Sequence, residues 1–162
     1  MVPMRSLVPI ETNRTTLRAL TDGDLKEVHA VLGDPATCGG RSFFQPNQES
    51  TAAWIGRRIV HQRTHGFSIW AVQDSVTHEL VGLAGLFPSA GHEAEIGYVI
   101  RADRQQEGLA TEVVAAIVDA ADCERLALFA TIRAGNEASI RLATRSGFKP
   151  SGTDRGERGE LL

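Results

Sequence analysis

Residues 93–121 read EAEIGYVIRADRQQEGLATEVVAAIVDAA, and this stretch decides the fold. Its first part, Glu93–Ile100, is predicted to be a strand. Its last part predicts the strongest helix of the chain, because apolar residues recur on one helical face at Ala110, Val113, Val114, Ile117, Val118 and Ala121. The loop between them contains Gly108, so main-chain N–H groups can approach a ligand at the positive end of the helix dipole. This arrangement suits a phosphate or pyrophosphate, while the alternative interpretation is an ordinary turn that enters a helix.

The rest of the chain predicts further strands and helices on both sides of this stretch. Upstream come a strand over 15–20, a helix from a Thr21 cap to Gly33, a loop to Ser50, a helix over 51–65, and hairpin strands over 67–73 and 80–87. Downstream come a strand over 126–132, a helix over 137–146 closed by Gly147, and a polar tail with room for one short hairpin. On the helix over 51–65, Arg57, Arg58 and Arg63 are expected to face solvent. The order predicts an α/β (α+β) fold in which a mixed sheet carries helices on both faces.

The size and charge of the chain limit its function classes. With 162 residues and 42% hydrophobic residues, the chain is predicted to form one domain over 1–162, with 1–12 as a flexible or strand-leading segment. The net charge is −3 and the arginines are scattered, so a nucleic-acid partner is not expected.

The cysteines and the N-terminus indicate the cellular setting. Cys38 and Cys123 are far apart and lack metal-ligand spacing, so no metal site is expected and both are predicted to be reduced, buried thiols. Pro3 and Pro9 interrupt the only short apolar stretch near the start, which argues against a signal peptide. No window has the ~18 to 20 apolar residues of a membrane span. A cytoplasmic protein with no membrane partner is therefore predicted.

A second set of motifs extends the first. Asn136-Glu137-Ala138-Ser139 opens the predicted helix over 137–146, and Gly147-Phe148 closes it. Together with E-I-G-Y at 95–98 and Q-x-x-G-x-A at 105–110, these motifs resemble the GNAT N-acetyltransferase superfamily, particularly its ribosomal-protein N-terminal acetyltransferase branch. The resemblance covers about residues 12–152. It implies the GNAT fold: a mixed, mostly antiparallel sheet of six to seven strands, about four helices on both faces, and central strands that splay apart.

The resemblance also implies a cofactor, acetyl-CoA, and the residues that hold it. In this family main-chain amides of the loop bind the diphosphate of coenzyme A, and the matching residues here are Gln106, Glu107, Gly108, Leu109 and Ala110. Gln105 and Thr111 are also expected to bind the cofactor. Main-chain groups near Tyr98, Val99 and Ile100 would pair with the pantetheine amides. Asn136 is similar to a side chain that contacts the cofactor, although a plain helix N-cap is an alternative or additional interpretation.

Acetyl transfer to an amine needs a proton acceptor. A lysine-like amine has a pKa near ~10.4 and is protonated at neutral pH, so it must lose a proton before it attacks. Glu95 sits where histone-acetylating members of the superfamily place their catalytic glutamate; the alternative is a solvated or ion-paired side chain. Glu93 shares the strand face of Glu95. It is the second candidate for proton acceptor and is also predicted to bind the substrate, and His92 is the third candidate for proton acceptor.

The departing thiolate needs a proton donor. Many family members use a tyrosine four residues before the glycine of the G-F pair, but this chain has Ala143 there. Ser139 is the nearest substitute by motif position and is predicted to donate a proton or contact the cofactor. The alternative is a helical serine that makes only a local hydrogen bond.

The acceptor pocket is the least determined part. Phe43, Phe44 and Trp70 are candidates to line it. The alternative for an aromatic residue is a place in the core, and this alternative is favoured for Trp70 and Trp54. Acidic residues near the site raise the hypothesis of a cationic acceptor. The tail 151–162 is short for this family, so the acceptor groove is open or a second subunit completes it in a homodimer.

Three functions stay open at this point. The first is an N-acetyltransferase that uses a ternary complex to acetylate a primary amine, either a small molecule or a protein N-terminus, and releases coenzyme A. The second is transfer of another acyl group, such as succinyl. The third is a non-catalytic module that binds acyl-CoA as a sensor.

Overall fold

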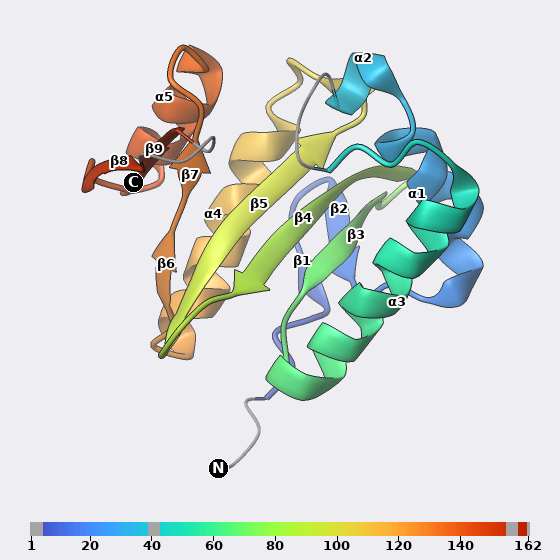
Figure 1. Ribbon diagram of the computed structural model, residues 1–162, viewed down its shortest axis with the longest axis horizontal. Helices are drawn as coiled ribbons and strands as arrows, with labels where there is room; N and C mark the ends of the chain where they lie inside the picture. Colours follow the sequence, from blue (N-terminus) through green and yellow to red (C-terminus); the bar gives the residue numbers. More distant parts are fainter. Residues whose placement is uncertain (1–4, 39–42, 155–158, 162) are drawn as a thin grey trace.

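The computed structural model describes residues 5–38, 43–154 and 159–161. A six-stranded sheet runs through the middle of the chain in the order β1-β2-β3-β4-β5-β6 (Figure 1). The strands are β1 (Ile10–Glu11), β2 (Thr15–Arg18), β3 (Ile69–Asp74), β4 (Leu80–Pro88), β5 (Glu93–Ile100) and β6 (Ala127–Phe129). All neighbours are antiparallel except β5 and β6, which are parallel. The predicted mixed, mostly antiparallel sheet is confirmed.

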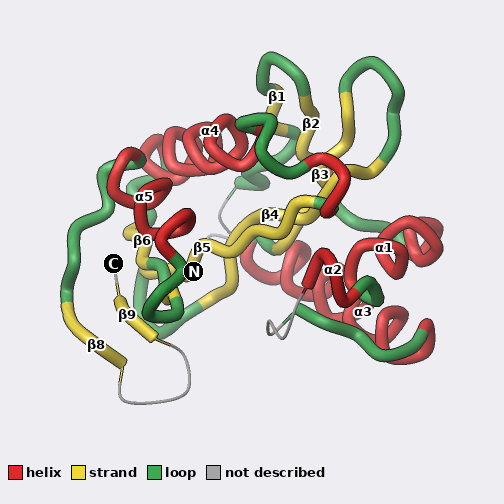
Figure 2. Tube along the Cα trace, turned by 90° about the horizontal axis from the view of Figure 1, so that it is seen from above, coloured by secondary structure: helices red, strands yellow, loops and turns green. Residues whose placement is uncertain are grey.

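Five α-helices in the described residues cover the sheet. They are α1 (Leu25–Leu32), α2 (Pro35–Cys38), α3 (Gln48–His65), α4 (Leu109–Cys123) and α5 (Glu137–Arg145), with short 3₁₀ turns η1 (Asp22–Asp24) and η2 (Ala102–Arg104). Figure 2 shows α1 and α3 on one side of the sheet and α4 on the other. The alternation of β5 explains this, because Val99 packs into the cluster with α1 and α3, whereas Ile96 and Ile100 pack into the cluster with α4.

Side-chain caps set two helix starts that the apolar period alone does not reveal. Oδ1 of Asn47 accepts a 2.8 Å hydrogen bond from the amide of Ser50, so α3 begins at Gln48, three residues before the predicted start. The carboxylate of Asp34 accepts from the amide of Ala36 and the hydroxyl of Thr37. These bonds stabilise α2 within a segment that was predicted to be a loop, and that part of the prediction is wrong.

Two predictions of exposure are also wrong. Arg58 is only 7% exposed, because it continues the buried stripe of α3 through Thr51, Trp54 and Ile55 at helical spacing. Cys123 is exposed, because the last position of α4 lies off the apolar stripe of that helix. Cys38 is buried as predicted, and its thiol lies 3.4 Å from the carbonyl oxygen of Val31.

The predicted strand over 126–132 is interrupted. β6 pairs with β5 for three residues only, the chain leaves the strand at Ala130, and β7 (Thr131–Ile132) joins a second sheet of order β7-β9-β8. This sheet contains the predicted tail hairpin, β8 (Gly152–Asp154) and β9 (Gly159–Leu161), with β9 antiparallel to both neighbours. The central strands β5 and β6 therefore splay apart, as predicted. The homodimer stays a prediction.

A membrane span was not expected from the sequence. Within the described part of the chain, no helix has both the length and the apolar character that crossing a bilayer requires.

Candidate functional site

The site begins where β5 and β6 separate. Glu95 is the last residue of β5 that pairs with β6, opposite Phe129, and on its other side it lies opposite Phe87 of β4. From Ile96 to Ile100, β5 continues beside β4 with no strand of the described chain on its other side. An open strand edge of this kind presents main-chain donors and acceptors to a ligand.

The loop that follows β5 exposes main-chain N–H groups. Gln106 and Gly108 both have positive φ, 64° and 81°, and Gly108 caps α4 without any side-chain hydrogen bond. Within the described chain, none of the N–H groups from Gln106 to Thr111 donates a hydrogen bond to the protein. A Cβ atom at Gly108 would lie near one protein atom only, the Nη2 of Arg14 at 3.6 Å. The geometry fits an anion such as a diphosphate at the helix N-terminus.

Arg14, which precedes β2, holds this loop against α4. Its Nη1 donates a 2.9 Å hydrogen bond to the carbonyl oxygen of Glu107, and its Nε donates to the carboxylate of Glu112 at 2.9 Å. The main-chain amide of Arg14 also donates to Glu112. No local sequence pattern predicts this contact, because Arg14 and Glu107 are far apart in the chain.

A second arginine ties the same loop to β3. The Nε of Arg104 donates to the carboxylate of Glu107 at 2.8 Å, and its terminal nitrogens lie 3.2 Å from Oδ2 of Asp74. The main-chain N–H groups of Thr77 and Val76 and the guanidinium of Arg104 lower the pKa of Asp74 to about 2, against the opposing effect of burial. Asp74 is therefore ionised at neutral pH and anchors the loop through Arg104.

Gln105 fastens the loop to the end of β5. Its side-chain amide donates a 2.9 Å hydrogen bond to the carbonyl oxygen of Ile100. The side chain of Gln105 therefore shapes the loop, and its main-chain N–H donates to the carbonyl oxygen of Ala102 at 3.4 Å. The side chain of Val99, another predicted cofactor-binding residue, is buried among α1 and α3 residues.

Tyr98 and Ser139 meet across the splayed strands. The hydroxyl of Tyr98 donates a 2.9 Å hydrogen bond to Oγ of Ser139 on α5. Asn136 caps α5, since its Oδ1 accepts from the amide of Ser139 at 3.3 Å. The helix-cap interpretation of Asn136 is therefore confirmed, and its predicted contact with a cofactor stays a prediction.

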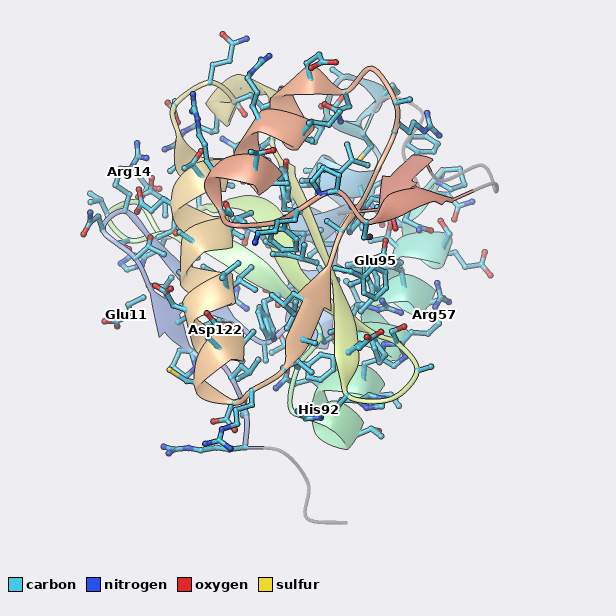
Figure 3. The ribbon with its side chains drawn as sticks, turned by 90° about the vertical axis from the view of Figure 1, so that its left-hand side faces the viewer. Glu11, Arg14, Arg57, His92, Glu95 and Asp122 are labelled. Atoms are coloured by element: carbon cyan, nitrogen blue, oxygen red, sulfur yellow. The ribbon has the colours of Figure 1, made fainter. Side chains whose placement is uncertain are left out.

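Glu95 lies on the opposite face of β5 from Tyr98. It belongs to the face of Gly97 and Val99, toward α1 and α3, and it is half-buried. Its carboxylate makes no hydrogen bond or ion pair within the described chain. Glu93 and His92 are exposed, and Figure 3 shows His92 well separated from Glu95, toward the bottom of the view. The structure thus separates the proton-acceptor candidate from the proton-donor candidate by one strand.

The two phenylalanine candidates differ. Phe43 is buried, with its ring centroid 5.7 Å from that of Phe87 and 6.4 Å from that of Trp54. Its ring and that of Phe87 occupy the space beside Gly97, where a Cβ atom would come within 3.2 Å of both. Phe44 is 38% exposed. Only Phe43 is thus placed on the face of Glu95 by these contacts.

The two tryptophans are buried, as predicted. Trp70 is fully buried, and its Nε1 donates a 2.7 Å hydrogen bond to Gln62. Trp54 is 5% exposed and packs against Phe43. The guanidinium carbon of Arg58 lies 5.4 Å from the ring centroid of Trp54 and 5.1 Å from that of Phe87. The cationic side chain therefore lies against two aromatic rings, and one of them, Phe87, is the strand partner of Glu95.

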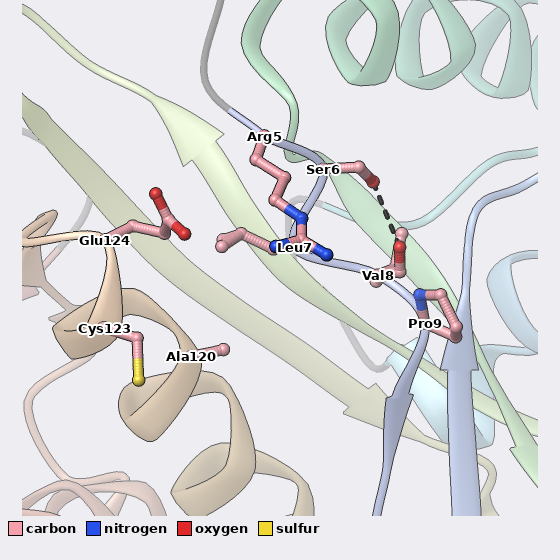
Figure 4. A pocket seen from close by; sticks show the side chains of 8 residues that line it. All are labelled: Arg5, Ser6, Leu7, Val8, Pro9, Ala120, Cys123 and Glu124. Atoms are coloured by element: carbon pink, nitrogen blue, oxygen red, sulfur yellow. Dashed lines mark hydrogen bonds between the residues drawn. The ribbon is translucent and has the colours of Figure 1, made fainter.

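One surface pocket lies elsewhere. It is formed by the segment before β1 and the end of α4 (Figure 4), and its lining residues are Arg5, Ser6, Leu7, Val8, Pro9, Ala120, Cys123 and Glu124. None of the predicted site residues is among them. The pocket is therefore separate from the candidate site.

Comparisons with known proteins agree with this geometry. The Acetyltransferase (GNAT) domain family matches residues 14–149. The uncharacterised N-acetyltransferase YoaA of Bacillus subtilis (strain 168) is 30% identical over 156 residues, which are 90% of this chain and 85% of YoaA.

Two solved structures share the fold. An acetyltransferase (GNAT family) from Bacillus anthracis has a TM-score of 0.79 at 20% identity, over 94% of this chain and 93% of that one. RimL, a ribosomal L7/L12 alpha-N-protein acetyltransferase in complex with coenzyme A, has a TM-score of 0.76 at 18% identity, over 95% of this chain and 93% of that one.

Proposed function

The chain belongs to the GNAT acetyltransferase family, and on that premise we propose that it transfers the acetyl group of acetyl-CoA directly to a primary amine in a ternary complex. One observation carries the proposal: the unpaired N–H groups of residues 106–111 lie at the end of a strand whose partner has diverged. Protein N-termini and small amines are both candidate acceptors. RimL, by its name, acts on a protein N-terminus.

The residues that would hold acetyl-CoA come from three parts of the chain: the loop before α4, the edge of β5, and the start of α5. The amides of Gln106 to Thr111 would bind the diphosphate, with Gly108 giving the close approach. The open edge of β5 at Tyr98, Val99 and Ile100 would pair with the pantetheine amides, and Asn136 would contact the same ligand. Acetyl-CoA supplies the acetyl group as a thioester.

Glu95 would take the proton of the incoming amine. Its carboxylate is half-buried, has no partner in the described chain and lies at the point where the strands part. A carboxylate in this position can accept the amine proton directly or through one water molecule. Glu93, two residues earlier on the same strand face, is exposed and is the reserve residue.

Ser139 would give a proton to the departing sulfur. Its Oγ already accepts a hydrogen bond from Tyr98, so the proton of the Ser139 hydroxyl is left to point elsewhere. Ala143 stands at the position of the family's tyrosine and is buried in the core beside the sheet. This position therefore carries a packed methyl group here and offers no hydroxyl. The pair Tyr98–Ser139 therefore supplies the hydroxyl that Ala143 cannot.

Release of free thiol on mixing the protein with acetyl-CoA and a panel of amines tests the proposal. Release with acetyl-CoA and an amine supports it. Release only with succinyl-CoA or another acyl-CoA favours transfer of that group, and acyl-CoA binding without release in any mixture favours a sensor.

The main-chain N–H groups of residues 106–111 form the proposed diphosphate cradle, which is tested separately by a matched pair of substitutions. Gly108→Trp should abolish the thermal shift caused by acetyl-CoA. Gly91→Trp is the control, because Gly91 also has positive φ, 73°, and open space around its Cβ position, but lies between β4 and β5. Equal loss of the shift in both variants would contradict the assigned cradle.

A further inference from the structure

Arg58 is a buried cation without a counter-charge. Only 7% of the residue is exposed, its Nε is fully shielded and has no hydrogen-bond partner, and the side chain makes no ion pair or hydrogen bond in the described chain. Burial, and then the charge of Arg57, lower the pKa of Arg58. A guanidinium nevertheless stays protonated in proteins. The chain thus keeps at least one N–H donor of this cation shielded and without a partner.

Arg58 lies beside cationic and aromatic side chains. His61, one turn further along α3, also has a buried nitrogen, Nδ1, without a partner, and burial, Arg58, His65 and Arg57 all lower the pKa of His61. The guanidinium carbon lies over the rings of both Trp54 and Phe87, at 5.4 and 5.1 Å from their centroids. Stacking of this kind fixes the planar group but satisfies none of its N–H donors.

The location of Arg58 connects it with the proposed proton acceptor. Phe87, which lies under the guanidinium, is the direct cross-strand neighbour of Glu95. Directly opposed residues of an antiparallel pair have Cα atoms about 4.5–5.5 Å apart and side chains on the same face.

We propose that the acceptor is a compact amine that also carries an anionic group, a carboxylate or a phosphate, and that this group pairs with Arg58 while the amine faces Glu95. The inference rests on the proposed acetyl transfer and names the substrate class of the same site. A planar guanidinium matches both anions through two parallel hydrogen bonds. The ring centroid of Phe87 lies 5.1 Å from the guanidinium carbon of Arg58, and Phe87 is the direct cross-strand neighbour of Glu95. The acceptor that we expect is therefore about the size of a small amino acid.

The proposal of an acceptor with an anionic group competes with the hypothesis that the acceptor carries only positive charge. A carboxylate near the site can favour a positive amine, but an unpaired buried arginine repels a ligand that has only positive charges. Amines matched in size and differing in charge separate the two ideas. β-Alanine and β-alaninamide form one pair, and O-phosphoethanolamine and ethanolamine form the second, which distinguishes carboxylate from phosphate.

The test measures kcat/KM for thiol release with each pair in the wild type, Arg58→Met and Arg57→Met. The wild type should prefer the anionic member of at least one pair by about tenfold or more, since a site built for a polar group rejects the analogue that lacks it. Arg58→Met should reduce that ratio to near one. Arg57→Met removes an exposed arginine from the same helix and should keep the wild-type ratio.

A binding measurement covers the case in which Arg58→Met does not fold. Titration of N-acetyl-β-alanine, and of the N-acetylated phosphate product, into the wild type should show tighter binding than the matching neutral product, and the difference should shrink with salt. Equal binding of anionic and neutral products, or an unchanged ratio in Arg58→Met, overturns the inference. Thiol release that prefers neutral amines overturns this inference alone, whereas absence of release with every acceptor overturns the proposed function.

Discussion

The hydroxyl of Tyr98 donates a 2.9 Å hydrogen bond to Oγ of Ser139, which joins β5 to α5 across the splayed strands. Tyr98 points to the α4 side of β5 and Glu95 to the α1 and α3 side. The two proposed proton-transfer groups therefore work from opposite faces of one strand. Each can be changed without disturbing the other.

Ser139→Ala should lower kcat by about 100-fold, in the range of a lost general acid, and leave the KM for acetyl-CoA within a few-fold. Tyr98→Phe should cost less, about tenfold, because it removes only the hydrogen bond that orients Ser139. Ser146→Ala is the control, since its hydroxyl bonds the carbonyl of Leu142 on the same helix. Stopped-flow measurement of thiol release gives both constants, and a kcat for Ser139→Ala equal to that of Ser146→Ala would rule out proton donation by Ser139.

The hydrogen bond itself can be observed. Tyr98 is the single tyrosine of the sequence, so a protein labelled at the tyrosine ring gives one phenol signal in an NMR spectrum. Ser139→Ala should shift this signal, whereas Ser146→Ala should leave it in place. An unshifted signal in Ser139→Ala would mean that the bond does not form in solution.

Glu95→Gln should leave acetyl-CoA binding intact and lower kcat by about 100-fold or more, as expected for loss of a general base. Glu93→Gln is a matched control on the same strand face, two residues away and exposed, and should change kcat less than about twofold. The comparison uses thiol release at saturating amine. If Glu93→Gln has the larger effect, the reserve residue is the proton acceptor and the assignment of Glu95 is wrong.

Arg14→Gln should raise the KM for acetyl-CoA by about five- to tenfold with kcat nearly unchanged, because it removes a support of the cradle but no reacting group. Arg18→Gln is the control: Arg18 also makes an ion pair from the N-terminal part of the chain, at 2.8 Å, but its partner is Asp24 of η1. Equal changes of KM in the two variants, at matched thermal stability, would show that the contact of Arg14 with Glu107 does not support ligand binding.

The low pKa of Asp74 predicts a pH-dependent stability. Because the folded pKa, about 2, lies below the ordinary value of 3.8, the ionised carboxylate stabilises the fold above about pH 4, and this contribution is lost as the pH falls toward 2. Asp74→Asn should therefore lower Tm by roughly a few degrees at pH 7, with the gap to the wild type closing between pH 4 and pH 2. Calorimetry over this range measures the gap, and a gap that is constant with pH would contradict the prediction.

The sequence predicted the parts of the fold that have a local pattern. The apolar stripe from Ala110 to Ala121 is α4, and Glu93–Ile100 is β5 with the predicted bounds. Gly108 has the positive φ of a turn before a helix. Such features depend on periodicity and on backbone freedom, which neighbouring residues encode.

Features that depend on distant partners could not be predicted in this way. The bonds of Arg14 to Glu107 and of Tyr98 to Ser139 join residues far apart in the chain, and no spacing rule reports them. Arg58 is a different case, because its place on the stripe of Trp54 and Ile55 was visible in the sequence. A charged residue was assigned to solvent by type, although its helical position places it inside.

The end of β6 before Ala130 has a consequence for the protein whenever no ligand is bound. Along Ile96–Ile100, in the middle of the molecule, the backbone groups at one edge of β5 have no neighbouring strand among the described residues. An open strand edge of this kind can pair with any extended peptide, including a segment of another copy of this chain. Occupancy by its proper ligand would thus protect this chain from aggregation as well as prepare it for chemistry.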